Sequence, residues 1–204
     1  MTFTAWISLF AICLLGAMFP GPSLAVVVKN TLGGGKVNGV LTAWAHAMGI
    51  AGYAIVTLFG LTIVLKQSPT LFKAISIAGA LYIAWLGVQA LRTKGGIAAK
   101  LASGEKASYM ESIRDGAMIS VLNPKIGLFF IALFSQFIDP GVGRNGQLVT
   151  VMTPFVTDGL WYTTIVLILS NTIILDKLRE KAHVIDKVTG VIFLLVAARI
   201  VFTA

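Results

Sequence analysis

Three ionisable side chains lie deep inside long apolar runs of this sequence: His46, Lys125 and Asp158. Lys125 follows a proline within the apolar stretch ISVLNPKIGLFFIALF at residues 119–134. A charge in hydrocarbon is costly, so such residues usually face a bundle interior or a water-filled cavity and mark the path of an ion or solute. These three residues are therefore the first candidates for a functional site.

Two proline breaks interrupt the apolar runs that flank these candidates. Pro20, Gly21 and Pro22 interrupt the first run, and Asn123 and Pro124 interrupt a later one. Each proline removes a backbone donor, and the residue before a proline is pushed out of the α region. Non-helical backbone at membrane depth is tolerated only where it is buried in protein or lines a wet cavity. The breaks therefore predict a cavity, with a simple helix kink as the alternative.

The charged groups beside the breaks can together bind a zwitterion. In this hypothesis Lys125 holds a carboxylate, and Asp158 holds an amino group or accepts a proton. Helices that begin after the breaks direct free N–H groups at the same carboxylate, and Ser23 and Asn123 add side-chain hydrogen bonds there. The alternative is that Lys125 and Asp158 only neutralise each other as a buried pair.

His46 and Trp161 are further candidates. An imidazole exchanges protons near neutral pH, so His46 is a candidate for proton coupling together with Asp158. A hydrogen-bonded packing role for this histidine is the alternative. Trp161 lies one helical turn from Asp158 on the same face, which makes it a candidate substrate contact.

Helix geometry places these groups at similar depths. At ~1.5 Å per residue, Lys125 and His46 lie roughly 15 Å from one face of the membrane, and Asp158 lies roughly 15 Å from the other. Pro22 lies about 10 Å from the first face. These depths converge near the midplane of a core that is ~30 Å thick. The sequence therefore predicts one site between the first, second, fourth and fifth spans.

The elements that must position these residues are predicted to be transmembrane helices. Hydrophobic residues make up 57% of the 204 residues and charged residues 12%, whereas a typical soluble domain has about 25% charged residues. A helix needs ~20 apolar residues to span the membrane. Six runs with at most one charge fit this length: residues 3–28, 37–65, 74–91, 116–138, 148–175 and 188–204. We predict an all-α polytopic membrane protein with six transmembrane helices, broken in spans 1 and 4.

The net charge of +8 is concentrated between alternate spans. The loops after the first, third and fifth spans hold Lys29, Lys36, Arg92, Lys94, Lys100, Lys106, Arg114, Lys177, Arg179, Lys181 and Lys187. By the positive-inside rule these loops are cytoplasmic, and both termini lie on the outer side. The basic charge is thus explained as an insertion signal with added contacts to anionic lipid, and nucleic acid is not an expected partner.

A polar linker at about residues 93–115 divides the chain into two halves, about residues 1–92 and 116–204. Each half holds three spans, and the halves begin on opposite sides of the membrane. GAMFPGPSLAVVV (16–28) and GAMISVLNPKIGLFF (116–130) both run from Gly-Ala-Met into a proline break. Opposite topology is what an inverted repeat requires. We therefore predict a single transmembrane domain built from two inverted three-helix repeats.

The third span carries the small residues Gly79, Ala80 and Ala84. Small residues allow the backbones of two membrane helices to approach closely. A homodimer through this span is therefore one option for the oligomeric state.

Other functional classes find less support in the residues. A metal-ion exporter needs clusters of His, Cys or carboxylate ligands, and the chain has two His and one Cys. A thiol-redox carrier needs paired cysteines, and only Cys13 is present. An intramembrane hydrolase needs a nucleophile beside a base, for which Ser23 with His46 or Lys125 is the one combination available. We expect no enzyme, no cofactor and no metal site.

Five motifs, in order along essentially the whole chain, resemble the lysine exporter (LysE/RhtB) family. They are FPGPSLAVVVKNTLGGGKVNGV (19–40), GALYIAWLGVQALR (79–92), NPKIGLFFIALFSQFIDP (123–140), FVTDGLWY (155–162) and KVTGVIFLLVAARI (187–200). The tripeptide PGP alone is a weak signal. The tripeptide NPK before an aromatic-rich run, combined with YxxWLG, is more specific.

The resemblance implies a secondary active exporter of an amino acid or a close derivative, in the bacterial inner (cytoplasmic) membrane and driven by proton antiport. Its expected partners are the amino acid, protons and membrane lipid. The alternative is export of a different small solute or metal ion on the same fold. The site residues that the resemblance carries over are Pro20, Gly21, Pro22, Asn123, Pro124, Lys125 and Asp158.

Overall fold

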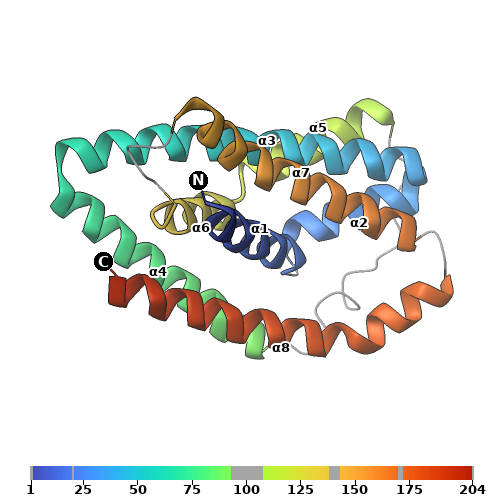
Figure 1. The fold of residues 1–204 in the computed structure, drawn as a ribbon. Helices are drawn as coiled ribbons and strands as arrows, with labels where there is room; N and C mark the ends of the chain where they lie inside the picture. The colour runs from blue at the N-terminus through green and yellow to red at the C-terminus, as the bar shows by residue number, and fades with distance from the viewer. Residues whose placement is uncertain (1, 20, 93–107, 138–142, 170–171, 204) are drawn as a thin grey trace.

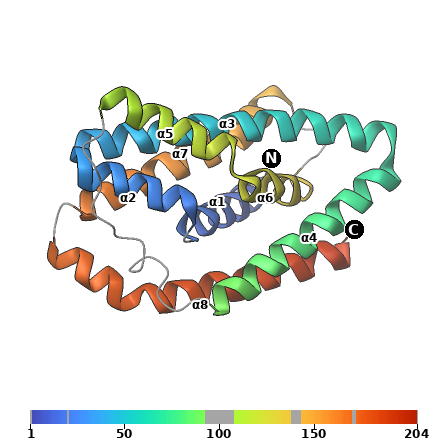
Figure 2. The same cartoon turned by 180° about the vertical axis from the view of Figure 1, so that it is seen from behind.

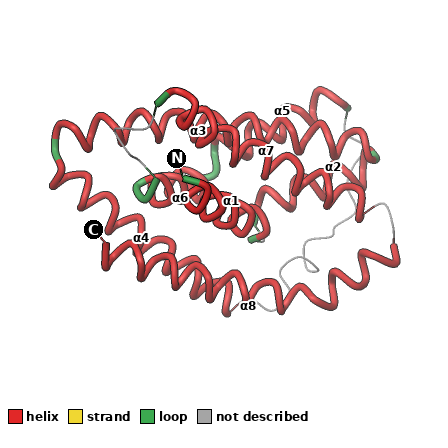
Figure 3. Tube along the Cα trace, in the orientation of Figure 1, coloured by secondary structure: helices red, strands yellow, loops and turns green. Residues whose placement is uncertain are grey.

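A computed structural model describes residues 2–19, 21–92, 108–137, 143–169 and 172–203. Within these ranges every regular element is a helix, joined where the connection is described by short loops (Figure 1, Figure 3). The helices are α1 (Phe3–Met18), α2 (Pro22–Gly34), α3 (Lys36–Gln67), α4 (Pro69–Arg92), α5 (Tyr109–Val121), α6 (Pro124–Phe134), α7 (Arg144–Leu169) and α8 (Thr172–Thr203). The predicted all-α class is confirmed for this part of the chain.

Helices α1 and α6 lie between two groups of helices (Figure 1, Figure 2). On one side α3 packs against α5 and α7, and on the other side α4 packs along α8. Contacts of α1 with α7, and of α6 with α3 and α4, join the two groups. A buried apolar cluster, to which Leu9, Ile83, Phe130, Leu133 and Phe193 belong, fills the space between them.

Both predicted helix breaks are present. The axis bends by 62° between α1 and α2, and by 55° between α5 and α6. Pro22 and Pro124 each occupy the first turn of the new helix, where the missing N–H would have no partner in any case. The Asn123 side chain caps α6 by accepting a hydrogen bond from the Lys125 N–H at 3.1 Å. Each proline therefore starts a new helix in a new direction.

The helices are those of a multi-pass membrane protein. By length and composition, α3, the Pro69–Gln89 part of α4, and α7 can each cross a membrane, and the count rises from 3 to 5 if each bent pair is one span. The sixth predicted span, residues 188–204, falls in α8, whose apolar part Gly190–Phe202 is shorter than a span. The six-span inverted repeat therefore stays a prediction.

Two predicted connections are partly helical. Helix α8 begins at Thr172 and runs through the charged segment that we predicted as the fifth loop, because Lys, Arg and Glu are good helix formers. Helix α5 begins at Tyr109, inside the predicted linker at 93–115, and residues 93–107 lie outside the described residues. Ser108 and Glu111 form a capping box that starts this helix.

The small residues of the third predicted span are used within the chain. A Cβ at Gly79 would lie 2.6 Å from the Cα of Ala132 in α6, so α4 and α6 touch at this point. Farther along, α4 and α8 approach so closely that a Cβ at Gly190 would lie 2.8 Å from the Gly87 carbonyl oxygen. Ala80 is 1% exposed. Gly79 and Ala80 are therefore packed within the chain, and the homodimer stays a prediction.

A buried polar network fixes α2 and α5 on α3. The Asn30 side-chain amide donates to Thr42 Oγ1 at 3.0 Å, and that hydroxyl donates to the Ser112 carbonyl oxygen at 3.1 Å. The Asn38 amide donates to Ser112 Oγ at 2.8 Å. Gly116 lies directly against the Thr42 backbone, where a side chain would not fit. Helices α2 and α5, one from each bent pair, are thus anchored on the same helix, which aligns the two breaks.

Candidate functional site

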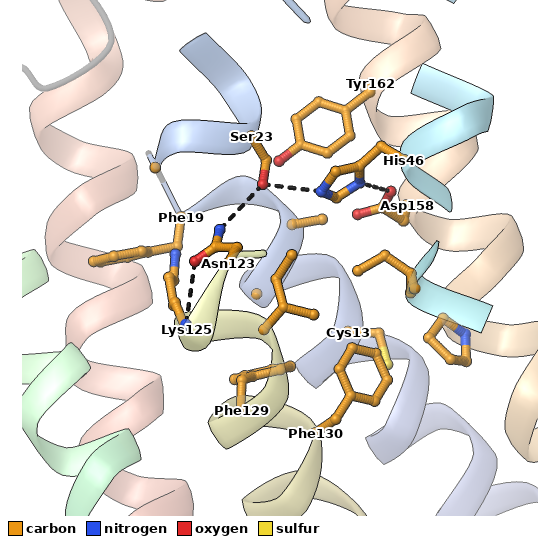
Figure 4. A pocket seen from close by; sticks show the side chains of 16 residues that line it. Cys13, Phe19, Ser23, His46, Asn123, Lys125, Phe129, Phe130, Asp158 and Tyr162 are labelled. Carbon is orange, nitrogen blue, oxygen red and sulfur yellow. Dashed lines mark hydrogen bonds and ion pairs between the residues drawn. The ribbon is translucent and has the colours of Figure 1, made fainter. Parts of the chain in front are cut away.

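A cavity lies where the two helix breaks meet α3 and α7 (Figure 4). Its volume is about 50 Å³, enough for a few water molecules. The lining residues come from every span in which we predicted the site. They are Cys13, Gly16, Ala17, Phe19, Gly21, Ser23, His46, Ile50, Asn123, Lys125, Ile126, Phe129, Phe130, Pro154, Asp158 and Tyr162.

A chain of hydrogen bonds crosses the cavity wall from α7 to the start of α6. Asp158 Oδ2 lies 2.7 Å from His46 Nδ1, and His46 Nε2 lies 2.9 Å from Ser23 Oγ. The Asn123 amide donates to the same Ser23 oxygen at 3.4 Å. The chain thus connects α7, α3 and the first turns of α2 and α6, and Figure 4 shows these side chains in one line.

His46 is the central link of this chain. It is 1% exposed, and the edge of its ring meets Tyr162 with the ring centroids 5.3 Å apart. We predicted either proton coupling or a packing role, and the position between a carboxylate and a hydroxyl provides a partner for each ring nitrogen. A neutral ring with its proton on Nδ1 donates to Asp158 and accepts from Ser23, whereas a protonated ring donates to both.

Asp158 pairs with His46. Its side chain is 8% exposed and, among the described residues, forms its ion pair with the imidazole. The buried pair that the structure shows is therefore Asp158 with His46, whereas neutralisation of Asp158 by Lys125 stays a prediction. Helix rotation explains the difference, because α7 turns Asp158 toward α3 while α6 directs Lys125 toward the end of α1.

Lys125 lies on the other side of the cavity from this pair. Its Nζ lies 3.8 Å from the centroid of the Phe19 ring, an arrangement in which the face of the ring attracts the ammonium. The same nitrogen would lie 3.4 Å from a Cβ at Gly21, so a side chain there would crowd the ammonium. The glycine between the two prolines thus leaves space for Lys125 at the break.

Some predicted site residues are not among those described as lining the cavity. Pro22 is exposed and acts as the first residue of α2, and Pro124 begins α6, with a side chain outside the described part. Pro20 lies outside the described residues. Trp161 is not among the lining residues, because it packs against the apolar cluster between α2, α3 and α7.

Tyr162 occupies the place that we predicted for Trp161. Its side chain is 3% exposed and lines the cavity, and its hydroxyl points toward Ser23 (Figure 4). A residue four positions after Asp158 lies on the same helix face, so the spacing could have identified Tyr162 as readily as Trp161. The apolar lining residues Cys13, Ile126, Phe129 and Phe130 had no such signal, because they resemble ordinary core residues.

The donor set does not resemble a metal centre. Within the described ranges, no group of three or more His, Cys, Asp or Glu side chains lies close enough together to hold a metal ion. The cavity instead presents one ammonium, one carboxylate–imidazole pair and neutral hydrogen-bonding groups.

Sequence comparison decides the family. A family model described as LysE type translocator matches residues 14–203, which include every residue of the cavity except Cys13. The chain belongs to the LysE type translocator family. This confirms the resemblance seen in the motifs and makes the chain a membrane translocator of that family.

Named relatives of this LysE-family chain match along most of its length. It is 30% identical to "Uncharacterized membrane protein YrhP" of Bacillus subtilis (strain 168) over 199 residues, which cover 91% of this chain and 94% of that protein. It is 27% identical to "Leucine efflux protein" of Salmonella typhimurium over 194 residues, covering 92% of each chain. No solved structure matches it.

Proposed function

We propose that this LysE-family protein is a secondary active exporter of an amino acid, driven by proton antiport across the bacterial inner membrane. One observation carries the proposal: the Asp158–His46–Ser23–Asn123 chain connects both helix breaks within a cavity that also contains Lys125. The similarity to a leucine efflux protein supports the choice of an amino acid as cargo. Both termini lie on the periplasmic side in this proposal.

The carboxylate of the substrate binds near Lys125. The ammonium supplies the charge, and the first turn of α2, which has no side-chain cap, supplies backbone N–H groups. Helix N-termini favour anions for the same reason. Asn123 already caps α6 with its side-chain oxygen, so its amide group is directed at Ser23 and the cavity.

The amino group of the substrate and a proton compete for the His46–Asp158 pair. The substrate ammonium and a protonated His46 imidazole are two cations that compete for the Asp158 carboxylate. Protonation from the outer side therefore weakens amine binding and favours release, and proton loss to the cytoplasm restores the site. Exchange of one cation for the other is the physical basis of antiport here.

The hydrogen bonding of Ser23 depends on the protonation state of His46. With a neutral imidazole, the Ser23 hydroxyl donates to His46 Nε2. With a protonated imidazole, Ser23 accepts from both His46 and Asn123, and its own hydrogen turns to another acceptor. The proton on His46 thereby changes the hydrogen bonding at the first turn of α2.

Transport into acid-loaded proteoliposomes tests the proposal. Labelled amino acids are added outside, and uptake is measured with and without a pH gradient for the wild type and for Lys125→Ala. We expect one or a few amino acids to accumulate only with the gradient, and the variant to lose this transport while remaining folded. Unchanged transport by Lys125→Ala would contradict the carboxylate site.

One observation favours a second candidate function, hydrolysis by Ser23. The order Ser23 Oγ to His46 Nε2, and His46 Nδ1 to Asp158, is that of a catalytic triad. Export ranks first because the chain belongs to a translocator family and because the Asn123 amide also donates to Ser23 Oγ. A fluorophosphonate probe separates the two: covalent labelling of wild type that is lost in Ser23→Ala supports hydrolysis, and no labelling supports export alone.

A further inference from the structure

The cavity has a polar end and an apolar end. Figure 4 shows Cys13, Phe129 and Phe130 together, away from Ser23 and His46. Apart from glycine, alanine and Phe19, the apolar lining residues are Cys13, Ile50, Ile126, Phe129, Phe130 and Pro154. The proposed contacts of a substrate carboxylate and amino group use only the polar end, so the apolar wall has no role in them.

We infer that the apolar wall receives the side chain of an aliphatic amino acid, and that Phe129, seated on Gly16, limits its size. The inference rests on the proposed function, because the charged groups of the amino acid must occupy the polar end. It adds the substrate class and a residue that determines specificity.

Charge excludes the basic and acidic amino acids. Among the described residues that line the cavity, the one carboxylate is Asp158, and His46 already holds it at 2.7 Å. A basic side chain at the apolar wall would be desolvated without a partner, and it would share the cavity with the Lys125 ammonium. An acidic side chain would likewise lose its water against phenyl and alkyl groups. Burial of an unpaired charge is among the largest penalties in a protein interior.

The cavity volume disfavours large side chains. The cavity measures about 50 Å³, whereas an engineered cavity that binds benzene in another protein measures about 150 Å³. Either kind of side chain requires the lining to move, and a phenyl or indole group requires a larger displacement than an aliphatic group. Phe129 and Phe130 are the largest groups of the apolar wall, so their positions decide how much room the side chain has.

Gly16 holds the Phe129 ring in its place. A Cβ at Gly16 would lie 2.7 Å from Phe129 Cζ and 3.0 Å from Cε1, so the tip of the ring rests on the glycine backbone. Phe130 and Phe193 pack against the same ring, each with a centroid separation of 5.9 Å. A methyl group at Gly16 therefore has to displace the Phe129 ring, which lines the cavity.

Uptake into acid-loaded proteoliposomes, measured for leucine, valine, phenylalanine, lysine and glutamate, tests the inference. We expect the wild type to transport leucine and valine, with lysine, glutamate and phenylalanine at least about tenfold lower in transport efficiency. Gly16→Ala should reduce the transport efficiency for leucine more than that for valine. Phe129→Leu keeps an apolar side chain at this position. It should raise the transport efficiency for phenylalanine, relative to that for leucine, by about tenfold or more.

The matched control is Gly52→Ala, because a Cβ at Gly52 meets nothing within 4 Å. It should keep the wild-type order of substrates. Efficient lysine or glutamate transport by the wild type would overturn the inference while leaving amino-acid export intact. The same substrate order in Gly16→Ala, Phe129→Leu and Gly52→Ala would overturn the role of Phe129. Transport of no amino acid would overturn the proposed function and this inference with it.

Discussion

Replacing Asp158 with asparagine should separate substrate binding from proton-driven accumulation. The amide oxygen can still accept a hydrogen bond from His46 Nδ1, which lies 2.7 Å from the native carboxylate. Loss of the charge on this hydrogen bond should therefore lower the free energy of unfolding by only about 1 kcal/mol. Asp158→Ala, by contrast, removes one partner of a buried pair, a change that costs about 3–5 kcal/mol.

The expected functional change is much larger than the change in stability. If one proton moves per amino acid, each pH unit supplies about 1.4 kcal/mol, so a gradient of about two units supports roughly 100-fold accumulation. Without an ionisable carboxylate, Asp158→Asn should accumulate substrate to a ratio near unity. Loss of the charged partner for the amino group should also weaken binding by about 1.5–3 kcal/mol, or roughly 10- to 150-fold.

Two assays in proteoliposomes distinguish these effects. Accumulation is measured with an acidic interior, and exchange is measured without a gradient at saturating labelled substrate. We expect Asp158→Asn to retain exchange and to lose accumulation. The control is Asp115→Asn, because Asp115 faces Lys29 at 3.6 Å near the surface, where an ion pair contributes about 0–1 kcal/mol. Accumulation of roughly 100-fold by Asp158→Asn under the same gradient would refute the coupling role of this carboxylate.

Three further predictions follow from the same geometry. Lys125→Ala should weaken substrate binding roughly 10- to 150-fold, because a charge-assisted contact to the carboxylate contributes about 1.5–3 kcal/mol; equilibrium binding of labelled substrate measures this change. His46→Gln retains hydrogen-bonding groups but cannot carry a proton, so the dependence of transport rate on internal pH should flatten. Gly190→Ala places a Cβ 2.8 Å from the Gly87 carbonyl oxygen, so it should lower the free energy of unfolding by about 1–3 kcal/mol, as measured by thermal unfolding. Gly60→Ala, which has open space around its Cβ, should not.

Each of these predictions has a result that contradicts it. Wild-type affinity in Lys125→Ala would move the carboxylate site elsewhere in the cavity. An unchanged pH profile in His46→Gln would leave the histidine as a positioning residue for Asp158. Equal melting temperatures for Gly190→Ala and Gly60→Ala would mean that α4 and α8 can separate at this contact without loss of stability.

The sequence by itself determined the class of the protein and the breaks in its helices. A charge or a proline inside an apolar run violates a local rule, and such violations are visible without any knowledge of packing. Lys125 and Asp158 were therefore singled out as candidate site residues by their surroundings alone, and the bends before α2 and α6 were predicted from Pro22 and Pro124. The charged linker was less well defined, because the capping box that starts α5 lies inside it.

Only the tertiary structure decided which of these groups meet. Whether Asp158 contacts His46 or Lys125, and whether Trp161 or Tyr162 faces the cavity, depends on the rotation of α7 against α3. The contact of the Phe129 ring with Gly16 depends on how α1 and α6 cross. Helix rotation and crossing are set by the sum of many weak apolar contacts between distant segments. No single residue carries that information, whereas the cost of a buried charge is a property of the residue and its immediate neighbours.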